Sequence, residues 1–450
     1  MIKMIESSKR PFLSGMKGFS VIWGGQFVSL LGTFMTNFAL TIWAWQVTGE
    51  ATALALTGLA FVLPNILLYP VAGALVDRWN RRLVMMLSDI AAGISTLVIF
   101  VLFSSGNLQI WHLYVTGAFA GLFQSFQFPA YSAAVSTMVE KEDYTRASGL
   151  LGLAQNTSGI LSPVAAGVLL PVIGTSGILI FDLFSVIVAI AALSIVNIPQ
   201  PEPKLAAEKN SLLEDTLFGF KYIRERPGLL GLQLVFFTIN FIGSLGFPLL
   251  APMVLSRTGD NAVILGAVQS AFGAGGVVGG LLLTAWGGPK KRVHGVLAGL
   301  ALSCLFGYIA IGLGKDMYTW AIGGFLMMIF NPLVNGSNQA IWQSKVPPEM
   351  QGRVFGTRAM IALISQPVAM AITGPLADKF LIPGMMEGGS LAPYFGWLVG
   401  VGPGTGISLL WVFLGIIGFI AGMGGYLFRE VRDVETILPD HDELQIPAES

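Results

Sequence analysis

The chain has 450 residues, of which 54% are hydrophobic and only 11% are charged, and its 25 basic and 25 acidic side chains give a formal net charge of zero. Soluble domains carry roughly 25% charged residues, so this composition excludes a protein with a large water-facing surface. A zero net charge without a basic segment also argues against nucleic acid as a partner. The single cysteine, Cys304, excludes an intrachain disulfide. We therefore predict an all-α integral membrane protein.

The hydrophobic residues gather in stretches long enough to cross a bilayer as helices, which takes roughly 20 apolar residues. Twelve such stretches follow one another, at 18–45, 51–76, 83–104, 111–138, 146–173, 175–197, 228–256, 260–286, 293–313, 317–344, 354–381 and 405–427. Of the 25 lysine and arginine residues, 22 fall on one side of the predicted membrane, and only Arg257, Lys315 and Lys379 fall on the other. Because positively charged loops stay in the cytoplasm, we predict that both termini are cytoplasmic.

A polar stretch at 198–227 divides the predicted spans six and six. Its second part carries apolar residues at the spacing of one helix face, which are Leu213, Leu217, Phe220 and Ile223. We predict that this part lies as a helix along the membrane surface. The predicted organisation is a cytoplasmic N-terminal segment at 1–17, a six-helix bundle at 18–197, this linker at 198–227, a second six-helix bundle at 228–427 and an acidic cytoplasmic tail at 428–450, which is expected to be mobile.

Charged turns recur in the two halves at one sequence offset. Asp77, which precedes Arg81, corresponds to Thr284, which precedes Lys290. Arg146 corresponds in the same way to Arg353. Asp77 and Thr284 are 207 residues apart, and so are Arg146 and Arg353. Such an offset indicates two bundles related by pseudo-symmetry. Parallel repeats of this kind place a substrate site near the middle of the bilayer, where the halves meet.

Two motifs carry a resemblance to a known family. Gly73-Ala-Leu-Val-Asp77-Arg78-Trp-Asn-Arg81-Arg82 lies between the second and third spans, and Val-Pro-Pro-Glu-Met-Gln-Gly352-Arg353-Val-Phe precedes the eleventh. With these motifs the chain resembles the major facilitator superfamily, and within it the macrolide-efflux-like branch of the twelve-span drug:proton antiporters. The resemblance implies the major facilitator fold, with twelve transmembrane helices in two pseudo-symmetric six-helix bundles.

The same resemblance implies a gate on the cytoplasmic side. In the resembled family the aspartate of the first motif closes that side by meeting the start of the eleventh span, whose positively polarised N-terminus favours a carboxylate. The gating residues implied are Gly73, Asp77, Arg78, Arg81, Arg82, Gly352 and Arg353. The alternative is that the arginines only fix the orientation and bind anionic headgroups.

The fifth span contains Gly159-Ile-Leu-Ser162-Pro163-Val-Ala-Ala-Gly167. This segment is similar to the antiporter signature of drug-efflux families, with Ser162 where glycine is usual. Pro163 removes one backbone hydrogen bond and is expected to kink the helix, while the two glycines admit a close neighbour. The segment is either part of an antiport mechanism or an ordinary packed helix.

Asp182 and Asp89 lie inside predicted spans. A charge at the bilayer centre costs roughly 2.5–3.5 kcal/mol, so both are candidates for proton coupling, unless each bends toward water or a headgroup. Members of the resembled branch often carry an aspartate in the first span where this chain has Thr33, which argues against a proton site there. Arg358 in the eleventh span is expected to reach the inner surface, and the alternative is a binding role.

The first, fourth, seventh and tenth spans carry neutral amides and hydroxyls interleaved with phenylalanines. The candidates for a substrate cavity are Gln26, Thr33, Asn37, Gln124, Gln127, Phe237, Asn240, Asn331 and Asn335. Such a lining suits a bulky, mostly apolar ligand and suits a dianion poorly, since these spans hold no deep cation. The alternative is that each amide bonds between helices.

The three histidines, His112, His294 and His441, lack metal-ligand spacing, and the chain has no phosphate-binding loop or hydrolase motif. We therefore expect no enzyme, cofactor or metal. The predicted function is export of amphipathic small molecules, drug-like or macrolide-like, in exchange for protons, by a monomer in the bilayer of a bacterial plasma membrane. Two alternatives stay open: a dedicated exporter of a metabolite such as a siderophore or lysophospholipid, and a non-transporting receptor with the same fold.

Overall fold

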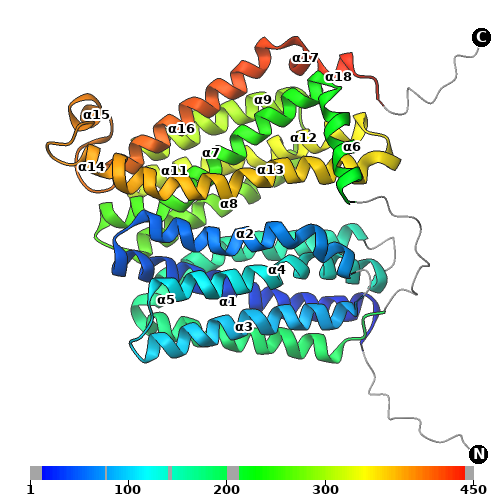
Figure 1. The fold of residues 1–450 in the computed structure, drawn as a ribbon, viewed down its shortest axis with the longest axis horizontal. Coiled ribbons are helices and arrows are strands. Elements are labelled where there is room, and N and C mark those ends of the chain that lie inside the picture. The colour runs from blue at the N-terminus through cyan, green and yellow to red at the C-terminus, as the bar shows by residue number, and fades with distance from the viewer. Residues whose placement is uncertain (1–12, 77–78, 140–143, 200–211, 441–450) are drawn as a thin grey trace, which may run out of the picture. The chain divides into compact units, whose positions relative to one another are not determined.

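The computed structural model describes residues 13–76, 79–139, 144–199 and 212–440. Within these ranges the long elements are all helices, and the one β-bridge joins Leu13 to Val196. Ten helices in the described part of the chain are long and apolar enough to cross a membrane. The prediction of an all-α membrane protein is confirmed (Figure 1), and the count of twelve spans stays a prediction.

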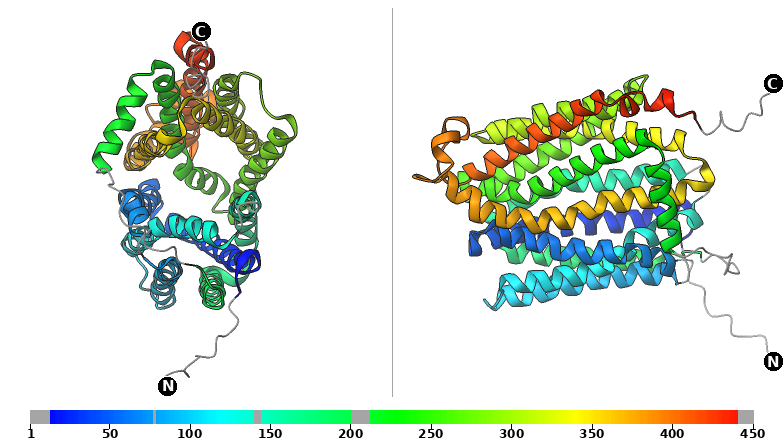
Figure 2. Two further views of the ribbon diagram at one scale, coloured as in Figure 1. Left: turned by 90° about the vertical axis from the view of Figure 1, so that its right-hand side faces the viewer. Right: turned by 45° about the horizontal axis from the view of Figure 1, so that its top comes forward.

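The chain forms two compact units. Unit 1 takes in Met1–Leu40 and Ala60–Leu205, and unit 2 takes in Thr41–Leu59 and Ala206–Ser450. The end of the first helix and the beginning of the second therefore belong to unit 2, although the rest of both helices belongs to unit 1. Figure 2 shows the helices of each unit side by side, almost end-on in its left view.

Unit 1 is built from five long helices or parts of them. They are α1 (Gly15–Thr48), α2 (Ala51–Val76), α3 (Arg81–Ser104), α4 (Ile110–Met138) and α5 (Tyr144–Ile195). The side chain of Asn80 begins α3 by accepting a hydrogen bond from the amide of Leu83, at 3.2 Å, which satisfies one of the amides that a helix start leaves unpaired.

The predicted stretches 146–173 and 175–197 both lie in α5, and they meet at its single non-helical residue, Gly174. The φ of Gly174 is 66°, in the left-handed region that glycine adopts without a steric penalty. The backbone is helical at Pro163, where the sequence led us to expect a kink. The two predicted stretches leave out only residue 174, so the predicted boundary between them coincides with this break.

The core of unit 1 lies between α1, α3, α4 and α5. Its fully buried members include Phe19 and Ile22 of α1, Met85 of α3, Ala130 of α4 and Leu193 of α5. Because α3 packs against both α4 and α5, polar residues on its inward face also meet those helices rather than lipid.

Unit 2 contains the helices that follow residue 211 and several breaks within them. The longer elements are α6 (Leu212–Arg224), α7 (Pro227–Thr258), α8 (Ala262–Trp286), α9 (Arg292–Ser303), α11 (Met317–Ile329), α12 (Asn331–Lys345), α13 (Pro348–Leu376) and α16 (Thr405–Gly424). The shorter ones are two π-helical turns, η2 (Cys304–Tyr308) and η3 (Ala377–Leu381), the helices α10 (Ile309–Leu313), α14 (Ile382–Met385), α15 (Ala392–Val399), α17 (Arg429–Arg432) and α18 (Val434–Ile437), and the 3₁₀ turn η4 (Gly425–Leu427). In this unit α8 packs against α11, α7 against α13, and α9 against α12.

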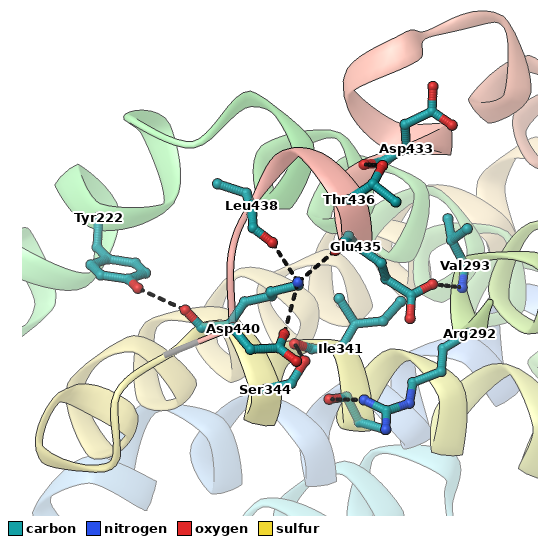
Figure 3. Close-up of polar contacts among 12 residues, drawn as sticks. Tyr222, Arg292, Val293, Ile341, Ser344, Asp433, Glu435, Thr436, Leu438 and Asp440 are labelled. Atoms are coloured by element: carbon teal, nitrogen blue, oxygen red, sulfur yellow. Dashed lines mark hydrogen bonds and ion pairs between the residues drawn. The ribbon is translucent and has the colours of Figure 1, made fainter. Parts of the chain in front are cut away.

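We expected the C-terminal segment to be a mobile tail. Its described part, up to residue 440, instead contains two short helices and is bound to α9 and α12. The carboxylate of Glu435 accepts a hydrogen bond from the amide of Val293 at 2.9 Å, and so caps the start of α9 (Figure 3). The ammonium group of Lys345, at the end of α12, donates to the carbonyl of Glu435 at 2.8 Å, to the carbonyl of Leu438, and to the carboxylate of Asp440 at 2.8 Å. These contacts hold the C-terminal segment against helices α9 and α12 of the same unit. The end of the predicted tail, 441–450, lies outside the described residues.

Candidate functional site

The first candidate proton carrier, Asp182, is buried in unit 1, with 2% of its surface exposed. Thr96 of α3 donates to its Oδ2 at 2.9 Å, and Thr33 of α1 lies 3.4 Å from its Oδ1. Ser185, one turn along α5, also donates to Oδ1 at 3.4 Å. Among the described residues, Asp182 forms no ion pair with a lysine or arginine. Its charge is therefore met only by neutral hydroxyl groups.

The second candidate, Asp89 of α3, is 6% exposed and has the same kind of surroundings. Gln26 of α1 donates to its Oδ2 at 2.7 Å, and Gln127 of α4 donates to its Oδ1 at 3.0 Å. The two amides also meet each other at 3.1 Å. Neither carboxylate reaches the surface of the structure, so both remain inside the helix bundle and bond to neutral side chains.

Helical spacing arranges these residues as two polar rows that face each other. Gln26 and Thr33 are seven residues apart on α1, and Asp89 and Thr96 are seven apart on α3. Seven residues are two turns, about 10 Å along a helix axis, and return to the same face. The six residues that bond across these rows form what we call the acid seam: Gln26, Thr33, Asp89, Thr96, Gln127 and Asp182.

A glycine allows α1 and α5 to approach at the acid seam. A Cβ on Gly32 would lie 2.8 Å from Asp182 Oδ1 and would also clash with the hydroxyl of Ser185. The hydroxyl of Ser162 on α5 donates to the carbonyl of Leu31, the residue before Gly32, at 3.1 Å. Ser162, from the antiporter-like segment, therefore holds α5 against α1 beside the seam. Its neighbours Pro163 and Gly167 are buried as well, whereas a Cβ on Gly159 would meet nothing within 4 Å.

The candidates for cavity residues divide into two groups. Gln26, Thr33 and Gln127 belong to the acid seam, so for these three the interpretation as bonds between helices is the one the structure shows. The remaining six are exposed or partly exposed within their own unit: Asn37, Gln124, Phe237, Asn240, Asn331 and Asn335. Asn335 donates to Asn331 at 3.0 Å, and Asn240 donates to the carbonyl of Phe236 at 2.7 Å.

The gating motif is described only in part. Asp77 and Arg78, and the surroundings of Gly73, Gly352 and Arg353, lie outside the described residues. Arg81 donates to the hydroxyl of Thr137 on α4 at 3.3 Å, and Arg82 donates to the carbonyl of Ser194 on α5. Both contacts bind α3 to helices of its own unit, and the gate stays a prediction.

Sequence reasoning missed a contact at the other end of α2. The carboxylate of Asp378, in the π-helical turn η3, accepts hydrogen bonds from the amides of Ala51 and Thr52 at 3.0 and 2.7 Å. Nearby, the indole of Trp45 donates to the carboxylate of Asp260 at 3.1 Å. Asp378 thus caps α2 from 326 residues away, a placement that no local sequence pattern signals. We call these bonds to Ala51 and Thr52 the α2 cap.

Arg358 of α13 also differs from expectation. Its guanidinium does not extend away from the helices but donates to Gln339 Oε1 of α12 at 2.9 Å. It lies over the ring of Trp342 at 5.2 Å, and within 6.0 Å of the rings of Phe236 and Phe355. Such aromatic faces attract a cation. We call these five residues the arginine site.

The fold and these buried polar groups define a multi-pass helical membrane protein. The sequence profile of the Major Facilitator Superfamily matches residues 22–370, and the chain belongs to this family. The prediction from the sequence motifs is confirmed, including the likeness to macrolide efflux proteins. Macrolide efflux protein A of Streptococcus pyogenes is 27% identical over 368 residues, which are 80% of this chain and 89% of that protein.

Other relatives and solved structures agree with this assignment. Enterobactin exporter EntS of Shigella flexneri is 25% identical over 373 residues, 80% of this chain and 84% of that protein. A bacterial homologue of the human lysosomal transporter Spinster superposes with a TM-score of 0.67 at 16% identity, covering 93% of this chain and 98% of the other. A bacterial homologue of the iron transporter ferroportin gives 0.63 at 13% identity, covering 92% and 99%. The two structures support the fold alone.

Proposed function

We propose that this protein exports bulky amphipathic small molecules across the bacterial plasma membrane in exchange for protons, by alternating access. The relatives named for macrolide efflux and enterobactin export support the direction of transport. The observation that carries the proposal is the acid seam, in which two membrane-embedded carboxylates are held by neutral partners. Intramembrane carboxylates are costly and mark proton pathways in many transporters.

The seam has the chemistry that reversible protonation needs. A hydroxyl can donate to a carboxylate and can also accept from a carboxylic acid. Thr96 therefore keeps a hydrogen bond to Asp182 whether or not the acid holds a proton. A paired lysine would favour only the charged form, and the described part of unit 1 places none there. In this proposal Asp182 takes up and releases the proton, and Asp89 serves as a second acceptor.

Alternating access also needs contacts that break and re-form. The segment Thr41–Leu59 clusters with unit 2 although the rest of α1 and α2 clusters with unit 1. The α2 cap holds this segment through two backbone amides. A carboxylate at a helix N-terminus contributes roughly 0.3–1 kcal/mol, up to about 2 kcal/mol when partly buried. A contact of that strength stabilises one conformation without preventing its release.

The test is transport by the purified protein in liposomes with an imposed pH gradient. A radiolabelled macrolide and the neutral dye N-phenyl-1-naphthylamine should accumulate in vesicles with an acidic lumen, because protons leave as substrate enters. A protonophore should abolish the accumulation. Protein-free liposomes control for passive trapping of the weakly basic macrolide. Equal accumulation with and without protein, for both compounds, would refute proton-coupled export of these amphipathic compounds.

A second candidate is a dedicated metabolite exporter with the same mechanism, favoured by the relative named as an enterobactin exporter. It predicts that a siderophore is transported in the same vesicles while the macrolide and the dye are not.

A further inference from the structure

Unit 2 holds a partly exposed cation, Arg358, that has no acidic partner among the described residues. Arg358 is the eleventh residue of α13, and Gln339, which receives its hydrogen bond, is six residues before the end of α12. Six residues correspond to about 9 Å of helix, so the guanidinium is held inside the bundle rather than at the helix end. Among the side chains that the structure describes, no aspartate or glutamate pairs with it.

The surroundings of Arg358 satisfy only part of its bonding capacity. A guanidinium has five N–H donors in a planar fork, and one side-chain acceptor, Gln339, is present at 2.9 Å. The rings of Trp342, Phe236 and Phe355 attract the charge but accept no conventional hydrogen bond. Arg358 itself is partly exposed, whereas Trp342 is fully buried. The remaining donors are therefore available on the exposed side of the guanidinium.

The backbone at Arg358 is fixed from a third helix. Gln233 of α7, which is 2% exposed, donates to the carbonyl of Arg358 at 3.2 Å. The arginine site thus joins α7, α12 and α13, and its position does not depend on a loop.

The arginine site continues a polar row of α12 that begins with two of the predicted cavity residues, Asn331 and Asn335. Asn331, Asn335 and Gln339 follow one another at four-residue intervals on α12, and so lie on one face. All three are at least partly exposed within unit 2. Arg358 bonds to the last residue of this row.

We propose that Arg358 binds an anionic group of the exported molecule, a carboxylate or sulfonate, while the partly exposed ring of Phe355 contacts its apolar body. The proposal rests on the proposed export function and adds amphipathic anions to the substrate class proposed there. An unpaired cation inside a membrane protein usually has a functional partner, and the planar guanidinium fork matches a two-oxygen anion.

Two dyes that differ by one charged group test the proposal. 1-Anilinonaphthalene-8-sulfonate carries a sulfonate on the same framework as the neutral N-phenyl-1-naphthylamine. Their binding is measured with the full-length protein in phosphatidylcholine nanodiscs, after subtraction of empty nanodiscs. Arg358→Gln should weaken sulfonate binding about ten- to hundredfold, the range expected for hydrogen bonds to a charged group, and leave the neutral dye unchanged within a factor of about two.

Two further variants separate charge from folding. Arg358→Lys keeps the charge but not the fork, and should recover part of the lost affinity. Arg224→Gln removes an exposed arginine of α6 and should change neither dye. If Arg358→Gln does not fold, the wild type still decides: sulfonate binding no tighter than neutral binding overturns the proposal. Equal weakening of both dyes by a folded Arg358→Gln also overturns it, because a structural role would produce that result.

The outcome for export is independent of this test. If the neutral dye is transported under a pH gradient and Arg358→Gln leaves sulfonate binding intact, the anion site is wrong and export stands. If neither dye nor the macrolide is transported by the wild type, the export proposal fails whatever the binding data show.

Discussion

The acid seam of unit 1 and the arginine site of unit 2 meet the cost of buried charge in different ways. Asp89 and Asp182 have both carboxylate oxygens bonded by hydroxyls or amides that come from neighbouring helices. Arg358 has one side-chain acceptor and a set of aromatic rings. The acids are surrounded by partners that tolerate either protonation state, whereas the arginine keeps its charge and has donors to spare.

This difference suggests a division of labour. A group that gains and loses a proton needs partners that both donate and accept, as hydroxyls do. A group that recognises an anion needs a permanent charge with free donors, as a guanidinium has. The proposed proton pathway would then lie in unit 1 and the proposed anion contact in unit 2.

The largest effect is expected for Asp182→Asn. The amide cannot carry the proton, so accumulation driven by a pH gradient should fall at least about tenfold, while binding of the sulfonate dye in nanodiscs should stay within a factor of about two. Asp182→Glu, which keeps a carboxylate, should retain part of the coupling. Full pH dependence in Asp182→Asn would remove Asp182 from the proton pathway, and full pH dependence after Asp89→Asn is added as well would end the proposed division.

The packing of the acid seam predicts a second, smaller effect. Gly32→Ala places a Cβ against Asp182 and Ser185, and overpacking of this kind typically costs about 1–3 kcal/mol. We expect a lower melting temperature and weaker coupling, measured by thermal unfolding in detergent and by vesicle flux. Gly24→Ala on the same helix is the matched control, because its Cβ would meet nothing within 4 Å. Equal melting temperatures for the two variants would show that α1 and α5 are not closely packed at the seam.

Removing the α2 cap tests whether Asp378 holds the start of α2 during transport. Asp378→Asn removes the charge at the start of α2, so this segment should detach more often. The reporter is a cysteine introduced as Thr52→Cys in a Cys304→Ser background. It should react a few times faster with a membrane-impermeant maleimide when Asp378→Asn is present. Asp316→Asn is the control, since Asp316 accepts from the amide of Thr319 in its own helix. Unchanged labelling in Asp378→Asn would mean that the cap does not control this segment.

The smallest effect is expected at the C-terminal segment. The ammonium of Lys345 donates to Asp440 and lowers the pKa of that carboxyl below its usual value. A lowered pKa means that docking is favoured above the ordinary pKa and is lost as the pH falls through the lowered one. The protection of amides 434–440 against hydrogen exchange, corrected for the intrinsic pH dependence of the exchange rate, should therefore fall modestly below about pH 4. In Asp440→Asn this corrected protection should no longer depend on pH in that range, and a persistent dependence would point to another group.

Much of the fold was accessible from sequence because lipid imposes strict rules on a chain. Long apolar stretches must be helical, since the bilayer offers no partner for an open backbone, and the predicted stretches coincide with helices wherever the structure describes them. Helix starts such as Asn80 follow from local chemistry. The predicted boundary at Gly174 also coincides with the break in α5, where glycine adopts a left-handed backbone without a steric penalty.

The candidate site was only partly predictable. Asp182 and Asp89 stood out because carboxylates are rare in such stretches, but their partners did not. Thr33, Gln26 and Gln127 were assigned to a cavity, since an amide or hydroxyl in a span gives no sign of which helix it faces. The cap on α2 and the surroundings of Arg358 join residues too far apart in sequence for any spacing rule.

The sequence alone determined that the chain lives in a membrane, that it is helical, and that it carries a few charges too costly to be accidental, because these follow from composition and from the energy of transferring groups into lipid. Only the tertiary structure decided which groups surround each charge: hydroxyls around Asp182, amides around Asp89 and aromatic rings around Arg358. The physical reason is that hydrogen bonds and ring contacts act over a few ångströms, so their partners are fixed by helix packing and not by distance along the chain.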